Sequence, residues 1–152
     1  MTSVAIPLVV RRTIKALPGP LFDAFATEAS LTCWFTPSPD ITVEALNYDF
    51  TPGGRFRLRY RMPDGRNPVV AGVFEVIDRP KQIVMTWEWQ APDPLENVPM
   101  KVSFRFLEKQ NATEVVITHE GIPSDSACSI HADGWEATLS VLDAFFIRET
   151  QQ

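Results

Sequence analysis

The segment from residue 55 to residue 62 constrains the fold more than any other part of the chain. Every second residue in it is an arginine, and the residues between them are apolar or aromatic: Phe56, Leu58, Tyr60 and Met62. A period of two is typical of a β-strand with one face in water and the other packed. A strand of this kind needs hydrogen-bonded neighbours and a cover for its apolar face.

Other segments of the chain show the same alternation. We expect a first strand over residues 7–16 and further strands near residues 41–45, 69–77, 83–89, 100–106 and 115–119. Turn-forming residues separate them, as at Pro52-Gly53-Gly54 and Pro63-Asp64-Gly65. Consecutive strands joined by short turns predict an antiparallel meander.

Helical spacing occurs in three places. Leu21, Phe22 and Phe25 predict a helix from Pro20 to about residue 28, and Ser30 is the expected cap of a second short helix. A long helix should begin at Ser124 or Ser126 and run to about residue 148. Its apolar stripe recurs at spacings of four, three and four, and consists of Trp135, Leu139, Leu142 and Phe146.

The predicted fold class is therefore α+β, with residues 1–152 forming one domain. A curved antiparallel sheet of about six or seven strands should wrap around the long C-terminal helix, with two short helices after the first strand. The inward-facing residues are bulky rings, and such rings can line a space without filling it. An apolar pocket is expected between the long helix and the sheet.

This order of elements and motifs resembles the START-like superfamily, also called SRPBCC or Bet v 1-like. The closest likeness is to the family of the activator of heat-shock protein 90 ATPase. The matching segments are Leu17-Pro18, 21–25, 31–35, 52–57, 72–76, 80–87, 113–119 and Gly134-Trp135 with Leu139 and Leu142. The resemblance implies a helix-grip fold with a hydrophobic cavity. It does not imply one function, because this superfamily hosts many.

Strand alternation and the helical stripe together predict the residues that line the cavity. We expect the ligand-binding set to be Trp34, Phe56, Tyr60, Phe74, Trp87, Phe104, His119 and Trp135. Trp34 is included because the short helices should cover one end of the groove. Most of these side chains are apolar, and Tyr60, His119 and the indole N–H groups would supply the orienting polar contacts. The alternative is a filled core in which the same rings pack on one another.

Charge and composition exclude several classes of partner. The net charge is −5, whereas a nucleic-acid surface needs a basic excess. The four arginines of residues 55–61 are better explained by ion pairs with glutamates on neighbouring strands. No apolar run is long enough to insert into a membrane, and Arg11 and Arg12 follow the N-terminal apolar run, which is the wrong order for a signal peptide. Two cysteines do not make a disulfide framework, so we expect a cytoplasmic protein with reduced, part-buried thiols.

No complete set of catalytic residues or metal ligands stands out. His119 and His131 are the only histidines, and neither has two further ligands at a workable spacing, so no metal or other cofactor is expected. His119 shares parity with Val115 and Ile117 and is either a core histidine or a group that orients a ligand. Arg12 is expected to be exposed at a sheet edge.

Three functions remain open on the sequence alone. The leading hypothesis is a module that binds a small apolar or aromatic molecule in the cavity. The second is an interaction protein that acts on a chaperone or in a stress response. The third is a cyclase-like or dehydratase-like enzyme that uses His119, Tyr60 or Arg12 as acid or base. The sequence also leaves a homodimer open.

Overall fold

The computed structural model describes residues 6–150 of the chain, and side chains as far as residue 148. Seven strands form one sheet in which every pairing is antiparallel. They are β1 (Leu8–Ile14), β2 (Thr42–Tyr48), β3 (Arg55–Arg61), β4 (Val69–Asp78), β5 (Gln82–Trp89), β6 (Met100–Lys109) and β7 (Ala112–Glu120). Three helices complete the fold: α1 (Pro18–Asp23), α2 (Glu28–Leu31) and α3 (Asp125–Thr150).

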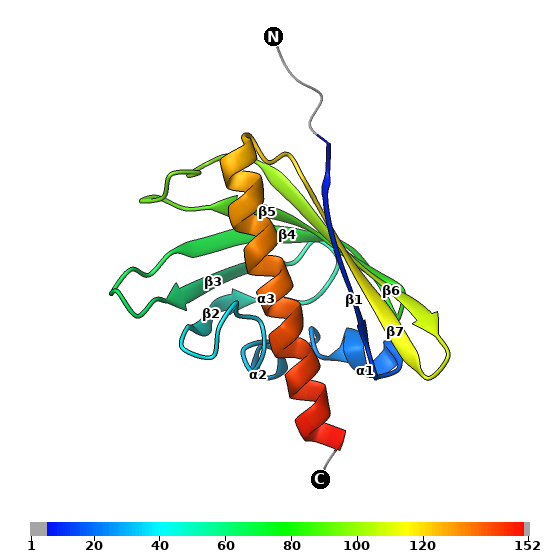
Figure 1. Ribbon diagram of the computed structural model, residues 1–152. Helices are drawn as coiled ribbons and strands as arrows, with labels where there is room; N and C mark the ends of the chain where they lie inside the picture. The colour runs from blue at the N-terminus through cyan, green and yellow to red at the C-terminus, as the bar shows by residue number, and fades with distance from the viewer. Residues whose placement is uncertain (1–5, 151–152) are drawn as a thin grey trace.

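The order of the strands across the sheet is β1-β7-β6-β5-β4-β3-β2. Strands β2 to β7 therefore form the expected meander. Strand β1 adds a further edge strand by pairing with β7, where Val10 lies opposite Ile117. Strands β1 and β2 lie at opposite edges of the sheet, and α1 and α2 connect them. Figure 1 shows the sheet curving around α3, with α1 and α2 at one end. The predicted helix-grip arrangement is confirmed.

Strand β3 follows the alternation that its sequence predicts. Phe56, Leu58 and Tyr60 are buried, while the arginines between them face outward. Glu44 on β2 accepts from Arg59 Nε at 2.8 Å and from Arg61 Nη2 at 2.6 Å. The arginines of this strand thus take part in cross-strand ion pairs, as expected.

Two irregularities give the sheet its curvature. The pairing register shifts at residues 45–47 of β2 and at residues 74–76 of β4, and bulges of this kind bend a strand and increase its twist. Gly72 of β4 lies against the backbone of β5 and the ring of Phe56, so that a β-carbon there would overlap the Thr86 carbonyl oxygen and come within 2.7 Å of Phe56 Cε1. Absence of a side chain at this position lets the aromatic ring of β3 pack directly on β4.

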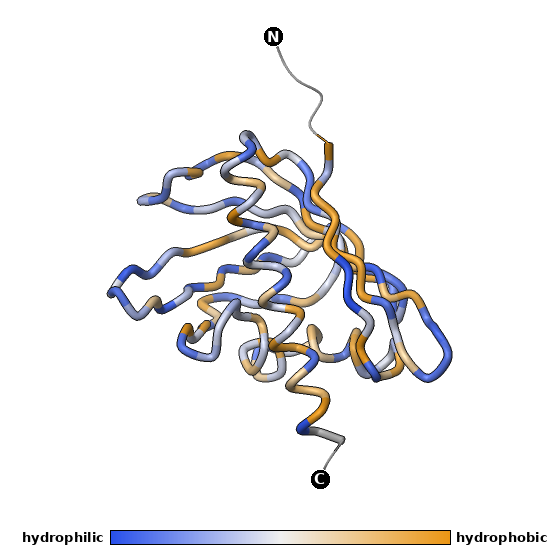
Figure 2. The backbone as a smooth tube through the Cα atoms, viewed as in Figure 1, coloured by the Kyte–Doolittle hydropathy of each residue, from blue (hydrophilic) through white to orange (hydrophobic). Residues whose placement is uncertain are grey.

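Helix α3 covers the inner face of the sheet. Its N-terminus is capped by Ser124, whose Oγ accepts from the backbone N–H of Ala127 at 3.2 Å. Trp135, Leu139 and Leu142 are buried, and Phe146 packs against the core as a partly buried residue. The predicted stripe therefore faces the sheet. Figure 2 shows that the hydrophilic residues gather at the β3–β4 and β6–β7 turns, away from this contact.

The short helices differ in detail from the prediction. Helix α1 ends at Asp23, and α2 begins at Glu28, earlier than expected. The cap of α2 is Thr27 and not Ser30, because Thr27 has an extended backbone and its Oγ1 accepts from the N–H of Ser30 at 3.1 Å. Cys33 follows α2 and is exposed, whereas Cys128 in α3 is part-buried.

Candidate functional site

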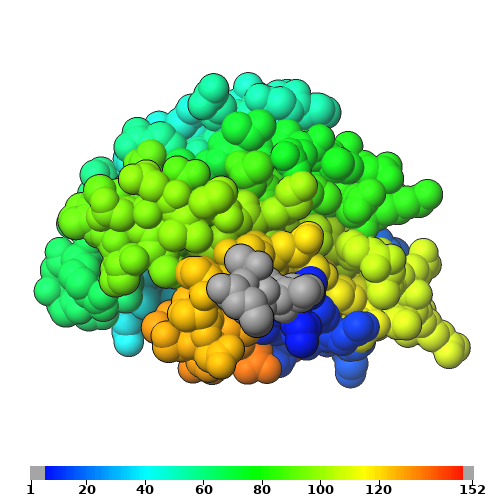
Figure 3. All heavy atoms as spheres, turned by 90° about the horizontal axis from the view of Figure 1, so that it is seen from above, coloured from blue at the N-terminus to red at the C-terminus, as the bar shows by residue number. Residues whose placement is uncertain are grey.

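A cavity of about 560 Å³ lies between the first half of α3, strands β3 and β5, and the loop of residues 90–99. Figure 3 shows this loop beside the first turns of α3 at one end of the molecule. Apolar and aromatic side chains form most of the walls: Tyr60, Met62, Trp87, Trp89, Leu95, Ala127, Ile130 and Trp135. The polar residues that border it are Arg66, Asp93, Ser124, Ser126, His131 and Thr138. Its size is typical of a small-molecule site.

Three of the eight residues predicted to contact a ligand line this cavity: Tyr60, Trp87 and Trp135. They come from β3, β5 and α3, so the structure brings together three elements that are far apart in the sequence. All three side chains are at least nine-tenths buried. Their rings provide flat walls against which a ring-shaped molecule can stack.

The other five predicted residues lie outside the cavity lining and pack inside the core: Trp34, Phe56, Phe74, Phe104 and His119. Phe25 and Phe35, which come from the segment of the short helices, fill the adjoining half of the groove. The ring centroid of Phe25 lies 4.8 Å from that of Trp34 and 4.9 Å from that of Phe104. The groove therefore has a packed half, next to α1 and α2, and an open half next to the first turns of α3.

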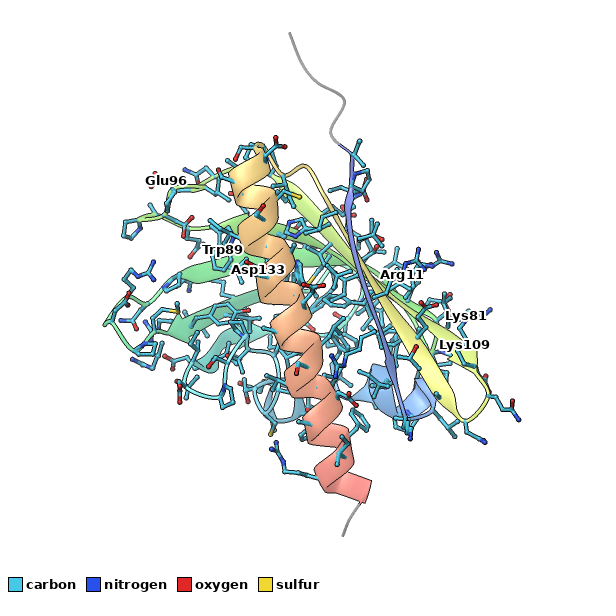
Figure 4. All side chains as sticks on the ribbon, viewed as in Figure 1. Arg11, Lys81, Trp89, Glu96, Lys109 and Asp133 are labelled. Atoms are coloured by element: carbon cyan, nitrogen blue, oxygen red, sulfur yellow. The ribbon has the colours of Figure 1, made fainter. Side chains whose placement is uncertain are left out.

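The prediction omitted several residues of the open half. Trp89 shares parity with Trp87 on β5, and Ile130 and His131 precede Trp135 by about one turn of α3, so their spacing contained the signal. Leu95 lies in a proline-rich loop without periodicity, and no pattern in the sequence indicated it. Figure 4 shows Trp89 beside the first half of α3, with Glu96 marking the loop beyond it.

His131 ties the aromatic wall to the helix. Its Nδ1 lies 2.9 Å from the carbonyl oxygen of Ala127, and its Nε2 lies 3.2 Å from the indole nitrogen of Trp89. An indole N–H can only donate, so Nε2 is the acceptor and Nδ1–H donates to the carbonyl. Both nitrogens of a neutral imidazole are thereby used, and the ring of Trp89 is held against α3.

His119 is a second such tether, deeper in the core. Trp135 Nε1 donates to His119 Nδ1 at 3.0 Å, and His119 Nε2 lies 3.3 Å from Met100 Sδ. The imidazole is completely buried. Burial, the main cause, and the nearby His131 together lower the pKa of His119 to about 3. His119 is therefore neutral near neutral pH and fixes the orientation of Trp135.

Three residues were considered for catalysis, Arg12, Tyr60 and His119, and of these three only Tyr60 lines the cavity. Arg12 Nε and Nη2 both donate to Asp143 Oδ2, at 3.1 Å and 2.8 Å, and join β1 to the C-terminal half of α3. His119 does not line the cavity. Burial raises the pKa of the Tyr60 hydroxyl above its ordinary value, which favours the neutral phenol as a hydrogen-bond donor.

Within residues 6–150, no three His, Cys, Asp or Glu side chains form a group that could hold a metal ion. No helix in that part of the chain is both long enough and apolar enough to cross a membrane.

Comparison with known proteins relates this geometry to a family. The family described as "Activator of Hsp90 ATPase homolog 1-like protein" matches residues 15–146. None of the curated protein sequences matches the chain.

Solved structures share the fold at low sequence identity. The AHSA1 protein from Silicibacter pomeroyi has a TM-score of 0.83 and 24% identity, over 95% of this chain and 99% of that one. A protein from Arthrobacter aurescens has a TM-score of 0.80 and 16% identity, over 92% and 85% of the two chains. A protein from Chromobacterium violaceum has a TM-score of 0.79 and 18% identity, over 93% and 97%.

Proposed function

Because the chain belongs to the family of activator of Hsp90 ATPase homolog 1-like proteins, whose START-like fold often holds hydrophobic ligands, we propose that it binds a small apolar or aromatic molecule in the cavity beside α3. The observation that carries the proposal is the open half of the groove, with a volume of about 560 Å³ and walls made of Tyr60, Trp87, Trp89 and Trp135. The rest of the groove is packed.

The energetics favour such a ligand. Apolar surface that leaves water on binding contributes about 25 cal/mol per Å², before the losses of ligand and side-chain freedom. The two histidine tethers hold Trp89 and Trp135 in place before a ligand arrives. A wall that is already ordered loses less conformational entropy on binding, and this raises affinity.

Gly134 offers a direct test of the cavity. It lies in α3, lines the cavity, and a β-carbon added there would meet no heavy atom within 4 Å. Gly134→Phe should fill the cavity without displacing the backbone. Gly134→Ala is the matched control, since it also removes the helix glycine, a change that favours the helix by about 1 kcal/mol, and adds only one carbon.

Binding is measured with an environment-sensitive apolar dye and by the quenching of tryptophan fluorescence in the native protein. We expect wild type and Gly134→Ala to bind the dye, and Gly134→Phe to bind it at least about tenfold more weakly. Native mass spectrometry of freshly purified protein should show a retained small molecule that Gly134→Phe lacks. If the native wild type binds no apolar probe, or if Gly134→Phe binds as well as Gly134→Ala, the proposal is wrong.

A further inference from the structure

Most of the indole and phenol donors of this chain are already paired inside the fold. The chain has four tryptophans and two tyrosines. Three indole N–H groups and one phenol donate to the protein itself: those of Trp34, Trp89, Trp135 and Tyr48. Their acceptors are two backbone carbonyls and the two histidines. This is the usual state of buried donors.

Two donors break this rule, and both side chains line the cavity. The indole nitrogen of Trp87 is buried and has no hydrogen-bond partner among the described residues. The hydroxyl of Tyr60 also makes no hydrogen bond within residues 6–150. Trp87 is 2% exposed and Tyr60 is 8% exposed. The Trp87 nitrogen carries the cost of a buried donor without a partner, about 1–3 kcal/mol, whereas the Tyr60 hydroxyl is not fully covered and is open to an acceptor in the cavity.

Several acceptors around the cavity are by contrast already used by the protein. His131 uses both ring nitrogens, and Ser124 Oγ accepts from Ala127 N–H. Asp93 Oδ1, on the loop, accepts from Leu95 N–H at 2.9 Å. On the buried walls, the polar groups without a partner among the described residues are the Tyr60 hydroxyl, which can donate or accept, and the Trp87 indole, which can only donate. A ligand that offers hydrogen-bond acceptors fits them better than a ligand that offers donors.

The acceptor should be uncharged. Tyr60 and Trp87 lie on the buried walls, and neither carries a positive charge. The one guanidinium of the lining, Arg66, is largely exposed and its Nε is 2.7 Å from Asp64 Oδ2. A carboxylate placed between the two inner donors would lose its hydration without gaining a counter-ion, which is unfavourable. A carbonyl oxygen accepts two hydrogen bonds at a much smaller desolvation cost.

We propose that the cavity selects a flat ring molecule that carries a neutral carbonyl oxygen, and that the Tyr60 hydroxyl donates to this oxygen, with the Trp87 indole N–H as a second donor once its ring has turned. The inference rests on the proposed function and specifies its ligand class. Tyr60 is the principal donor. The nitrogen of Trp87 is covered by neighbouring atoms, so an incoming oxygen reaches it only after the indole ring turns.

The test uses two probes that differ by one carbonyl, fluorene and 9-fluorenone. Their affinities are measured by displacement of the apolar dye, and the ratio of the two affinities is compared among variants. A net hydrogen bond of ordinary strength corresponds to about a two- to tenfold change in affinity. We expect wild type to prefer fluorenone by at least that factor. Tyr60→Phe should reduce the ratio by about two- to tenfold, and Trp87→Phe should reduce it less.

Tyr48→Phe is the matched control, because the Tyr48 hydroxyl donates to the carbonyl of Phe25 and does not line the cavity. It should keep the wild-type ratio. The infrared carbonyl stretch of bound fluorenone gives a second measurement. It should lie at a lower frequency in wild type and Tyr48→Phe than in Tyr60→Phe.

The outcomes separate this inference from the proposed function. Equal affinities of wild type for the two probes would overturn the inference and leave the cavity as a general apolar site. So would a fluorenone preference that survives in both Tyr60→Phe and Trp87→Phe. Failure of wild type to bind either probe would overturn the proposed function and the inference together.

Discussion

Lowering the pH should destabilise this protein, and the buried His119 should contribute a separable part of the loss. The folded chain encloses its imidazole completely, and the two ring nitrogens face Trp135 and Met100. A proton added to Nδ1 would remove the acceptor of the Trp135 N–H and leave a charge in an apolar core. The pKa of His119 is lowered to about 3 by burial and by His131. In the unfolded chain an ordinary histidine has a pKa of about 6.5.

The sign follows from proton binding. Between about pH 3 and about pH 6.5 the unfolded state binds a proton on this residue and the folded state does not. The free energy of unfolding therefore falls as the pH falls through this range, by about 1.4 kcal/mol per pH unit. At about pH 5 the accumulated loss is about 2 kcal/mol relative to neutral pH. This value hardly depends on the folded-state pKa, provided that it lies well below 5.

The assay is urea unfolding at about pH 7 and about pH 5 for wild type and His119→Gln. Glutamine can still accept from the Trp135 N–H but does not titrate. The other titratable groups are the same in both proteins, so the difference between the two pH effects reports on His119. We expect wild type to lose about 2 kcal/mol more than His119→Gln. Equal losses in the two proteins would refute the assignment of a neutral, buried His119.

Three further perturbations test the fold and the site. Leu142→Asp should destabilise the protein by several kcal/mol in urea unfolding, because Leu142 is fully buried and the charge would have no partner; a soluble variant of unchanged stability would contradict the packing of α3. Gly72→Ala should lower the thermal midpoint, since the new carbon would strike the backbone carbonyl oxygen of Thr86 and the ring of Phe56, and Gly134→Ala, which has open space, serves as its control. Chelator treatment should leave the thermal midpoint and dye binding unchanged; stoichiometric zinc or iron found by elemental analysis would contradict this.

The elements of this fold were predictable because their patterns are local. The alternation of β3 identifies both faces of a strand, and the stripe from Trp135 to Leu142 identifies the buried face of α3. Helix boundaries were less predictable. Both Thr27 and Ser30 can cap a helix, and the choice depends on the backbone conformation at Thr27, which composition does not reveal.

The candidate site was only partly predictable for a different reason. Alternation tells which residues point inward, but it does not tell what covers them. Phe104 and Trp87 both point inward, yet Phe25 packs on the ring of Phe104, while the ring of Trp87 borders open space. The division of the groove into a packed half and an open half depends on where the short helices lie over the sheet. Their position is a property of the tertiary packing.

The proposed ligand preference depends on packing in the same way. Trp87 and Trp89 are two residues apart on one face of β5, and their sequence positions make them equivalent. They differ because His131, 42 residues after Trp89, accepts from the Trp89 indole, whereas no described residue accepts from Trp87. The register of α3 against β5 thus decides which indole N–H the protein pairs itself and which has no partner among the described residues. A related chain could keep the fold and the cavity volume and still select another ligand, simply by exchanging the histidine on α3.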